Sequence, residues 1–369
     1  MITESTITSR SWSETSGKEV YICGIGARTP LGFDAVATAA AAHCGISALG
    51  EHPCFVDKVV EPVNLAADVE FESSLNIGTR MAQMAVSAIG EALGKTFSER
   101  GDQRLQIWVG LPEARPGLPL DIGQSISAAI LNQFRTEAKD IHILQYGHAS
   151  GLMAMQMASL AISSGEADLC IATGIDSYHD ATTLQWLDDN GWLMSDENRN
   201  GFPPGEAASA CLLVSRSVVK RYQLRVLANI IAAMTTMEPN PIRGQSVCIG
   251  KGLTAALNGV IAVLDDSRQV ISTTYCDLNG ERYRNNELVY ALLRTQTGFV
   301  DAHDYQCPAD CWGDVGAASG LLFAILAIES SQRGYATGFL PLLWAGSECG
   351  YRTAILLSLH KPKTEFQNG

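Results

Sequence analysis

The sequence reads Gly147-His148-Ala149-Ser150-Gly151 between an apolar run, residues 141–146, and an Ala- and Met-rich run, residues 152–163. The turn Gly165-Glu166-Ala167-Asp168 and a second apolar run, residues 169–173, follow. We expect a strand, a sharp turn, a helix and a strand, the arrangement with which many α/β enzymes expose a nucleophile at a helix N-terminus. Here that position carries the imidazole of His148. The stretch therefore indicates more about the fold than about the activity.

Apolar runs and helix-forming runs alternate along the first half of the chain. We expect strands at residues 20–25, 105–111, 141–146, 169–173 and 208–215, and helices at residues 35–42, 78–93, 122–137 and 152–163. This alternation predicts an α/β protein with a largely parallel sheet that is covered by helices on both faces.

The second half repeats the order of these elements. Strands are expected at residues 226–236, 270–275, 339–345 and 353–359, and helices at residues 251–264, 285–297 and 313–331. Because each half closes with two strands after its last long helix, the pattern indicates an internal duplication. We expect a disordered tail at residues 1–18, one half at 19–220 and another at 221–369, with the join near the basic stretch 216–225.

The bulk composition excludes several classes of function. The net charge of -13 argues against binding to nucleic acid or to an anionic membrane surface, and no apolar run approaches the roughly 20 residues of a membrane span. Ten scattered cysteines are typical of reduced thiols in a cytoplasmic protein. The spacing of Cys307 and Cys311 lacks a second ligand pair, so we expect neither a metal nor a cofactor.

Four segments, in order along the chain, carry a resemblance to a known family. They are Cys23-Gly24-Ile25-Gly26-Ala27-Arg28-Thr29-Pro30-Leu31-Gly32, residues 147–174, the loop 193–207 that ends in Gly205-Glu206-Ala207, and Gly313-Asp314-Val315-Gly316-Ala317-Ala318-Ser319-Gly320. With them the chain resembles the beta-ketoacyl-acyl carrier protein synthases of the thiolase superfamily. The resemblance implies a thiolase-like five-layered αβαβα fold of two duplicated halves. It also implies a homodimer, with an acyl carrier protein or another protein as a further partner.

The same resemblance implies which residues occupy the catalytic positions of the family. Its condensing members use one Cys, which forms an acyl thioester, and two His, which assist decarboxylation of the incoming malonyl group. The Cys position falls on His148, the first His position on Cys276 and the second on Asp314. The loop that helps to hold the pantetheine arm reads Asp277-Leu278-Asn279-Gly280-Glu281. The resemblance also implies that Glu348, Cys349 and Gly350 lie near the site, and that Glu206 has a structural role.

These residues do not suit ordinary condensation. An acyl-imidazole hydrolyses readily, so His148 is a poor carrier of an acyl group. The helix N-terminus favours anions and predicts a lowered pKa, and hence a neutral ring, for His148. Asp314 would place negative charge where an enolate develops. We therefore do not expect ketoacyl synthase activity.

Two functions remain open. In the first, the chain is a degenerate synthase-like protein that acts as a scaffold, an accessory partner or an acyl- or peptide-binding protein. In the second, Cys276, His148 and Asp314 form a rewired triad for acyl transfer or thioester hydrolysis. Each residue also has a simpler interpretation: a turn histidine, a buried thiol and a helix N-cap. An acidic carrier protein could dock at one of two basic clusters: Arg216, Lys220, Arg221 and Arg225, or Arg282 and Arg284.

Overall fold

The structure is a computed structural model that describes residues 12–13, 19–72, 74–98, 105–134, 140–244, 246–264 and 270–360. Most of the expected tail, residues 1–18, lies outside the described residues. Within it, β1 (Trp12–Ser13) pairs antiparallel with β9 (Ala228–Met237) of the second half.

The first half of the chain builds one part of a large sheet, in the strand order β6-β5-β7-β8-β2. Its elements are β2 (Val20–Arg28), α2 (Ala35–His43), the hairpin of β3 (Leu49–Val56) and β4 (Pro62–Ala66), α3 (Ile77–Ser98), β5 (Leu105–Leu111), α4 (Ile122–Gln133), β6 (Ile141–Gln145), the 3-10 helix η3 (Gly147–Ala149), α5 (Ser150–Ser164), β7 (Leu169–Ser177), α6 (Ala181–Asp189) and β8 (Glu206–Ser215).

The second half builds a matching part, in the order β11-β10-β12-β13-β9. Its elements are α7 (Arg216–Tyr222), β9 (Ala228–Met237), α8 (Lys251–Ile261), β10 (Thr273–Cys276), α9 (Arg282–Thr295), η4 (Gln296–Gly298), β11 (Tyr305–Gln306), α10 (Ala309–Trp312), η5 (Gly316–Ala318), α11 (Ser319–Arg333), β12 (Pro341–Gly346) and β13 (Tyr351–Leu359). Strand for strand, the two orders correspond, as the duplicated sequence pattern predicts.

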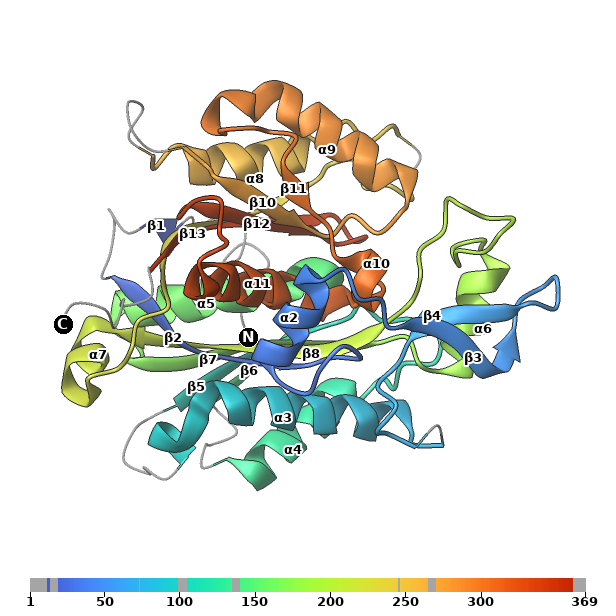
Figure 1. The fold of residues 1–369 in the computed structure, drawn as a ribbon, viewed down its shortest axis with the longest axis horizontal. Coiled ribbons are helices and arrows are strands. Elements are labelled where there is room, and N and C mark those ends of the chain that lie inside the picture. Colours follow the sequence, from blue (N-terminus) through green and yellow to red (C-terminus); the bar gives the residue numbers. More distant parts are fainter. Residues whose placement is uncertain are drawn as a thin grey trace.

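The elements stack in five layers, which agrees with the αβαβα fold (Figure 1). Helices α8 and α9 cover one outer face, α3 and α4 cover the other, and α5 and α11 lie between the two parts of the sheet. Antiparallel pairing of β2 with β9 links the two parts. The layers confirm the expected fold class, and they place the N-terminal ends of α5 and α11 near one another in the middle of the molecule.

The sheet is mixed, and the expectation of a largely parallel sheet was wrong. β5 runs parallel to β6 and β7, and β10 to β11 and β12, but the pairs β7–β8, β8–β2, β12–β13 and β13–β9 are antiparallel. The turn between β12 and β13 is too short for a crossover, and short turns join antiparallel neighbours.

Several boundaries also differ from the expected ones. The last long helix begins at Ser319, after a separate 3-10 turn, rather than at residue 313. Helix α4 ends at Gln133, and residues 135–137 of the expected helix lie outside the described residues. The basic stretch at the expected join forms α7. The hairpin β3–β4 and helix α6 were not expected.

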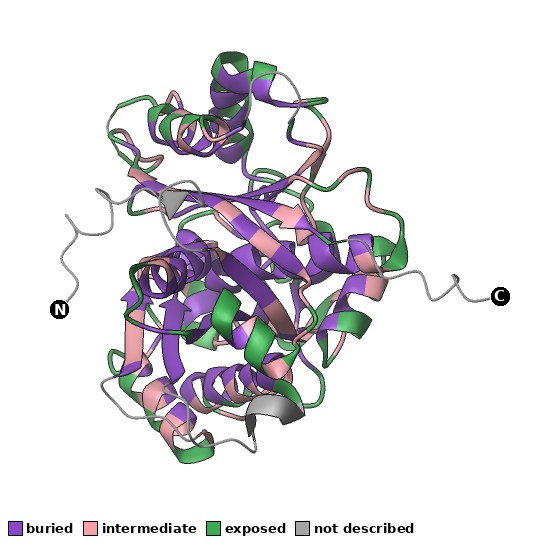
Figure 2. Ribbon diagram, turned by 90° about the vertical axis from the view of Figure 1, so that its left-hand side faces the viewer, coloured by how far each residue is buried: buried purple, intermediate pink, exposed green. Residues whose placement is uncertain are grey.

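The central layer is the most deeply buried part of the fold. Figure 2 shows the strands and the inner helices largely in purple, and in α5 twelve of fifteen residues are buried. A helix with no exposed face cannot be amphipathic, which explains its Ala- and Met-rich composition. Among the described residues, no helix combines the length and the apolarity that crossing a membrane requires.

Candidate functional site

His148 lies in η3, at the tip of α5, and it is buried. Gly147 before it has φ +79, a left-handed conformation that suits glycine, and a Cβ there would lie 2.6 Å from Oε1 of Glu113. The backbone N–H of Ala149 donates to Oγ of Ser347 at 2.9 Å, which ties this turn to the loop after β12. The conformation of Gly147 and this hydrogen bond thus fix the turn that carries His148.

Asp314 reaches the same place from the second half of the chain. The tips of α5 and α11 pack closely, since a Cβ on Gly151 would lie 2.5 Å from the carbonyl oxygen of Ala317. Nε2 of His148 lies 2.9 Å from both carboxylate oxygens of Asp314. Asp314 also accepts from Nδ2 of Asn279 at 2.6 Å and from the N–H of Gly316 at 2.8 Å. The structure therefore brings two of the expected site residues into direct contact.

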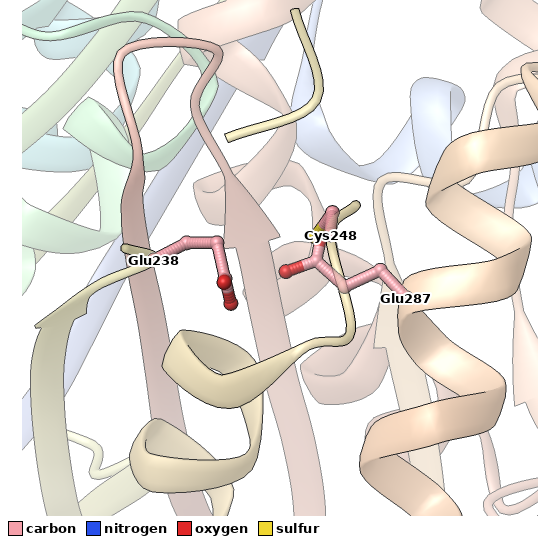
Figure 3. Close-up of side chains that lie close together, drawn as sticks. All are labelled: Glu238, Cys248 and Glu287. Atoms are coloured by element: carbon pink, nitrogen blue, oxygen red, sulfur yellow. The ribbon is translucent and has the colours of Figure 1, made fainter. Parts of the chain in front are cut away.

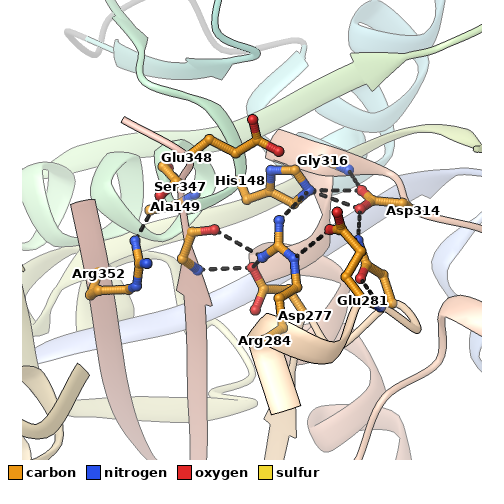
Figure 4. A network of polar contacts seen from close by, with 12 residues as sticks. His148, Ala149, Asp277, Glu281, Arg284, Asp314, Gly316, Ser347, Glu348 and Arg352 are labelled. Carbon is orange, nitrogen blue, oxygen red and sulfur yellow. Dashed lines mark hydrogen bonds and ion pairs between the residues drawn. The ribbon is translucent and has the colours of Figure 1, made fainter. Parts of the chain in front are cut away.

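Arg284 completes this network from α9 (Figure 4). Its Nη2 lies 3.3 Å from Nε2 of His148, and its Nη1 donates to Oδ2 of Asp277 at 2.9 Å and to the carbonyl of Gly346 at 3.0 Å. Its Nε donates to Oε2 of Glu281 at 3.3 Å. The guanidinium is thus buried among acidic partners, so Arg284 is unavailable as the docking surface that the sequence suggested.

The environment sets the charge of the His148–Asp314 pair. Burial has the largest effect and lowers the pKa of His148. The charge of Asp314, its hydrogen bond to the ring and the charge of Asp277 together outweigh burial and the repulsion of Arg284, so the pKa lies above its ordinary value. Burial raises the pKa of Asp314, and the attraction of His148 together with their hydrogen bond brings it well below its ordinary value. The expected lowering of the His148 pKa was wrong, because a carboxylate in contact exceeds the helix dipole.

The pairing with Asp314 also indicates the tautomer of His148. Two carboxylate oxygens at 2.9 Å require a proton on Nε2, so the ring donates there and Arg284 packs beside it without donating. The other nitrogen, Nδ1, has no hydrogen-bond partner within the part of the chain that the structure describes. The imidazole thus keeps one nitrogen for other contacts.

Cys276 does not join this pair. Its thiol donates to the carbonyl of Gln306 at 3.7 Å and lies in an apolar cluster with Leu288 and Trp344. Its neighbour Tyr275 belongs to the core around α11, so the alternation along β10 turns Cys276 to the outer face of the sheet. Burial raises the pKa of Cys276 well above its ordinary value. Of the three residues expected to converge, His148 and Asp314 are in contact and Cys276 is not. Arg284, paired with Asp277, lies beside His148 instead.

A cavity of about 240 Å³ opens over His148. Aromatic side chains form part of its wall: Tyr178, Trp186, Trp192 and Phe202. Charged side chains form another part: Glu113, Arg115, Asp176, Arg243 and Glu348. Its size is near or below the lower end of the usual range of ligand sites, which suits a small ligand.

The charged groups around the cavity are mostly paired with one another. Arg115 contacts Asp176 at 2.6 Å and stacks on the ring of Tyr178. Arg243 contacts Glu348 at 2.6 Å and lies over the ring of Trp192. Burial raises the pKa of Glu348, against the attraction of Arg243.

The other residues of the expected site flank this cavity. The backbone N–H of the exposed Cys349 donates to Oε1 of Glu113 at 3.0 Å, and Gly350 adopts φ +109 in the turn before β13. Glu206 lies away from it in β8, where it binds the buried guanidinium of Arg80 at 2.5 Å and accepts from Oγ of Ser177 at 2.7 Å.

Sequence reasoning missed Arg284, Arg115 and Arg243 as site residues. Each lies in a segment far from residue 148 in the sequence, so spacing alone could not connect them. The sequence did contain a signal for Arg284. It follows Asp277 and Glu281, two acidic residues of the loop that the resemblance assigns to pantetheine binding, and a helix is expected there.

A second cluster of possible ligands lies outside this site (Figure 3). Glu238, Cys248 and Glu287 offer atoms within 4.8 Å of one another. Glu287 is held by Arg352 at 2.7 and 3.0 Å, and Glu238 accepts from the N–H of Gly252 at 2.6 Å, at the start of α8. Since both carboxylates have partners and a guanidinium opposes a cation, we assign no metal to this cluster.

Comparisons with known proteins agree with this architecture. Residues 76–218 match the family described as beta-ketoacyl synthase, N-terminal domain. Among curated protein sequences, none matches the chain. The solved ishigamide ketosynthase/chain length factor matches with a TM-score of 0.75 and 14% identity, over 93% of this chain and 100% of that chain.

Two further solved structures give the same result. A type II PKS acyl-carrier protein in complex with its ketosynthase matches with a TM-score of 0.72 and 12% identity, over 94% of this chain and 100% of that chain. A beta-ketoacyl synthase from Burkholderia phymatum matches with a TM-score of 0.71 and 16% identity, over 93% and 100%. Residues 76–218 therefore resemble the N-terminal domain of the beta-ketoacyl synthases, and the chain has the thiolase-like fold of the ketosynthases.

Proposed function

We propose that this ketosynthase-like protein does not condense acyl chains and acts as an accessory partner of other proteins. The observation that carries the proposal is the contact of His148 with Asp314. At the helix tip that faces the cavity stands an imidazole, and its Nε2 is held 2.9 Å from two carboxylate oxygens.

The lining of the cavity supports the absence of condensation. Its described lining residues include no Cys, Ser or Thr, so it offers no thiol or aliphatic hydroxyl to hold an acyl group. The carboxylate of Asp314 would repel a developing enolate. Glu348, also at the cavity, adds to that repulsion when it is ionised.

The rewired triad receives no such support. A nucleophilic Cys276 would need its thiol near His148 and a thiolate at neutral pH. Instead its thiol contacts Gln306 and its pKa is raised by burial. We therefore do not favour acyl transfer or thioester hydrolysis by Cys276.

The partner belongs to the proposal as well. The matched structures include a ketosynthase/chain length factor and an acyl-carrier protein in complex with its ketosynthase. Strand β6 ends the described sheet and its residues are mostly half-buried, which leaves an edge where a second copy or a similar chain can pair. We propose a homodimer or a pair with a ketosynthase-like partner. The ten unpaired cysteines support a cytoplasmic location.

An acylation experiment tests the proposed function. The protein is incubated with hexanoyl-N-acetylcysteamine and then with malonyl-acyl carrier protein, with intact-mass measurement and release of labelled carbon dioxide as readouts. We expect no acyl adduct at residue 148 or 276 and no release above background. Stable acylation at either residue, or release that is lost in His148→Ala and kept in the exposed control His303→Ala, would overturn the proposal. Light scattering after gel filtration gives the oligomeric state, and a monomer that captures no ketosynthase-like chain would refute the partner role.

A further inference from the structure

The cavity contains a nitrogen that the pairing with Asp314 leaves unused. The side chain of His148 is 8% exposed, and its ring lies between Asp314 and Glu348 (Figure 4). Nε2 faces Asp314, while Nδ1 has no partner among the described residues. His148 lines the cavity, and Nδ1 is the ring nitrogen that the pairing with Asp314 leaves free for a ligand bound there.

We propose that His148 is a general base that takes a proton through Nδ1 from a small, uncharged, planar molecule bound in the cavity. Asp314 is then a positioning residue: it holds the proton on Nε2 and fixes the plane of the ring. This activity needs no thiol and no acyl chain, and it goes beyond the accessory role proposed above.

The surroundings of the ring strengthen Nδ1 as a base. A carboxylate behind an imidazole stabilises the imidazolium that forms when the other nitrogen takes a proton. The charged groups that face His148 come from several elements: Asp314, Arg284, Asp277 and Glu348. Burial and Arg284 oppose protonation, Asp314 and Asp277 favour it, and the balance raises the pKa of His148. A base of higher pKa has a stronger driving force for proton transfer, provided that the pH keeps it unprotonated.

The walls of the cavity define the class of substrate. Trp186, Trp192 and Phe202 offer aromatic surface against which a planar molecule can stack. Arg115 is paired with Asp176, and Arg243 with Glu348. A net charge on the ligand would compete with these internal pairs, whereas an uncharged molecule leaves them intact.

The elimination of 5-nitrobenzisoxazole provides a probe of matching chemistry. The base takes the proton from the ring carbon, the electron pair of that C–H bond forms the nitrile, and the N–O bond breaks to release a coloured phenolate. Atoms and electrons balance without an oxidant, a reductant or a second substrate. The probe is uncharged, planar and small.

We expect saturable turnover of this probe by the wild-type protein, with a loss of about 10²-fold in His148→Gln. Asp314→Asn should lower the rate and move the midpoint of the pH–rate profile to lower pH, because the carboxylate that raises the pKa of His148 is gone. A residue with a merely structural role would leave that midpoint in place. His303→Ala, which changes an exposed histidine, should keep the wild-type rate.

Three outcomes would overturn the inference. They are turnover no faster than that of free imidazole, an equal rate in wild type and His148→Gln, and a loss confined to Glu348→Gln, which would make Glu348 the base. A failure of this inference can be distinguished from a failure of the proposed function, because the probe carries no thioester and cannot acylate the protein in the way that a condensing substrate would. An inert cavity leaves the non-condensing role intact, and an acylated His148 refutes that role whatever the probe does.

Discussion

The substitution Asp314→Asn tests the central contact of the site. Asparagine has the shape of aspartate, so no cavity forms, but it removes the charge that faces His148 and Arg284. Breaking one partner of a buried ion pair costs about 3–5 kcal/mol, because the remaining charge is left without compensation. Asp314 is 3% exposed and His148 is 7% exposed, so solvent screens this pair little.

The expected change in melting temperature follows from the size of the chain. At about 2.1 cal/mol/K per residue, 369 residues give an unfolding entropy of about 0.8 kcal/mol/K. A loss of about 3–5 kcal/mol then lowers Tm by roughly 4–6 °C. Asp301→Asn is the matched control, since it removes the carboxylate of an Asp–His contact in which Asp301 is 63% and His303 84% exposed. Exposed pairs contribute little, so the control should melt like wild type.

The pH dependence should change sign. In wild type the pKa of His148 is raised in the folded state, so its contribution to stability is complete below the unfolded pKa of about 6.5 and is lost as the pH rises through the folded pKa. In Asp314→Asn, burial and Arg284 remain and lower that pKa, so stability is lost as the pH falls below about 6.5. Calorimetric melts of both proteins across this range give the two slopes. Equal Tm values and parallel slopes would refute the reasoning.

Three further predictions rest on other residues. Cys276 should resist iodoacetamide in the folded protein at neutral pH while the exposed Cys44 reacts, as peptide mass mapping would show; fast labelling of Cys276 would contradict its burial. His148→Cys should introduce a thiol with a raised pKa, because the thiol would face carboxylates. Alkylation rates measured against pH test this, and a thiolate at neutral pH would contradict it. Glu206→Gln should lower the free energy of unfolding by about 3–5 kcal/mol in urea, since Arg80 beside it is buried, and a loss below about 1 kcal/mol would speak against this.

Local pattern was sufficient for much of the fold. The run at residues 105–111 became β5 with the same bounds, because a fully buried strand is a continuous apolar run. The pattern failed where tertiary contacts decide. The last long helix begins only at Ser319 because Gly316 has φ +47, a left-handed conformation that interrupts a right-handed helix. The neighbouring strands β12 and β13 run antiparallel because a short turn joins them, and the hydrophobic periodicity of a sequence does not show the direction of strand pairing.

The candidate site was predictable in position and only partly in composition. His148 and Asp314 were placed by the resemblance, and the structure joins them. Cys276 was assigned by counting back from Glu287 in the next helix, and an error of one residue along a strand moves a side chain to the opposite face. Arg284 contacts His148 across 136 residues of sequence. A contact of that kind depends on how α9 packs in the second half, and the packing of a helix cannot be read from a single sequence.

The two halves of the chain explain why an acidic and a basic side chain meet here. The turns η3 and η5 hold corresponding places in the duplicated order, before α5 and before α11, and they contact each other. The N-terminal ends of these two helices therefore lie at one site. Their partial positive charge favours an anion. Asp314 is that anion, and it accepts from the N–H of Gly316 at the start of η5. Once the carboxylate is held there, it raises the pKa of His148 although the helix dipole alone would lower it. The helix dipoles therefore stabilise the carboxylate of Asp314, and this carboxylate raises the pKa of His148 that the dipoles alone would lower.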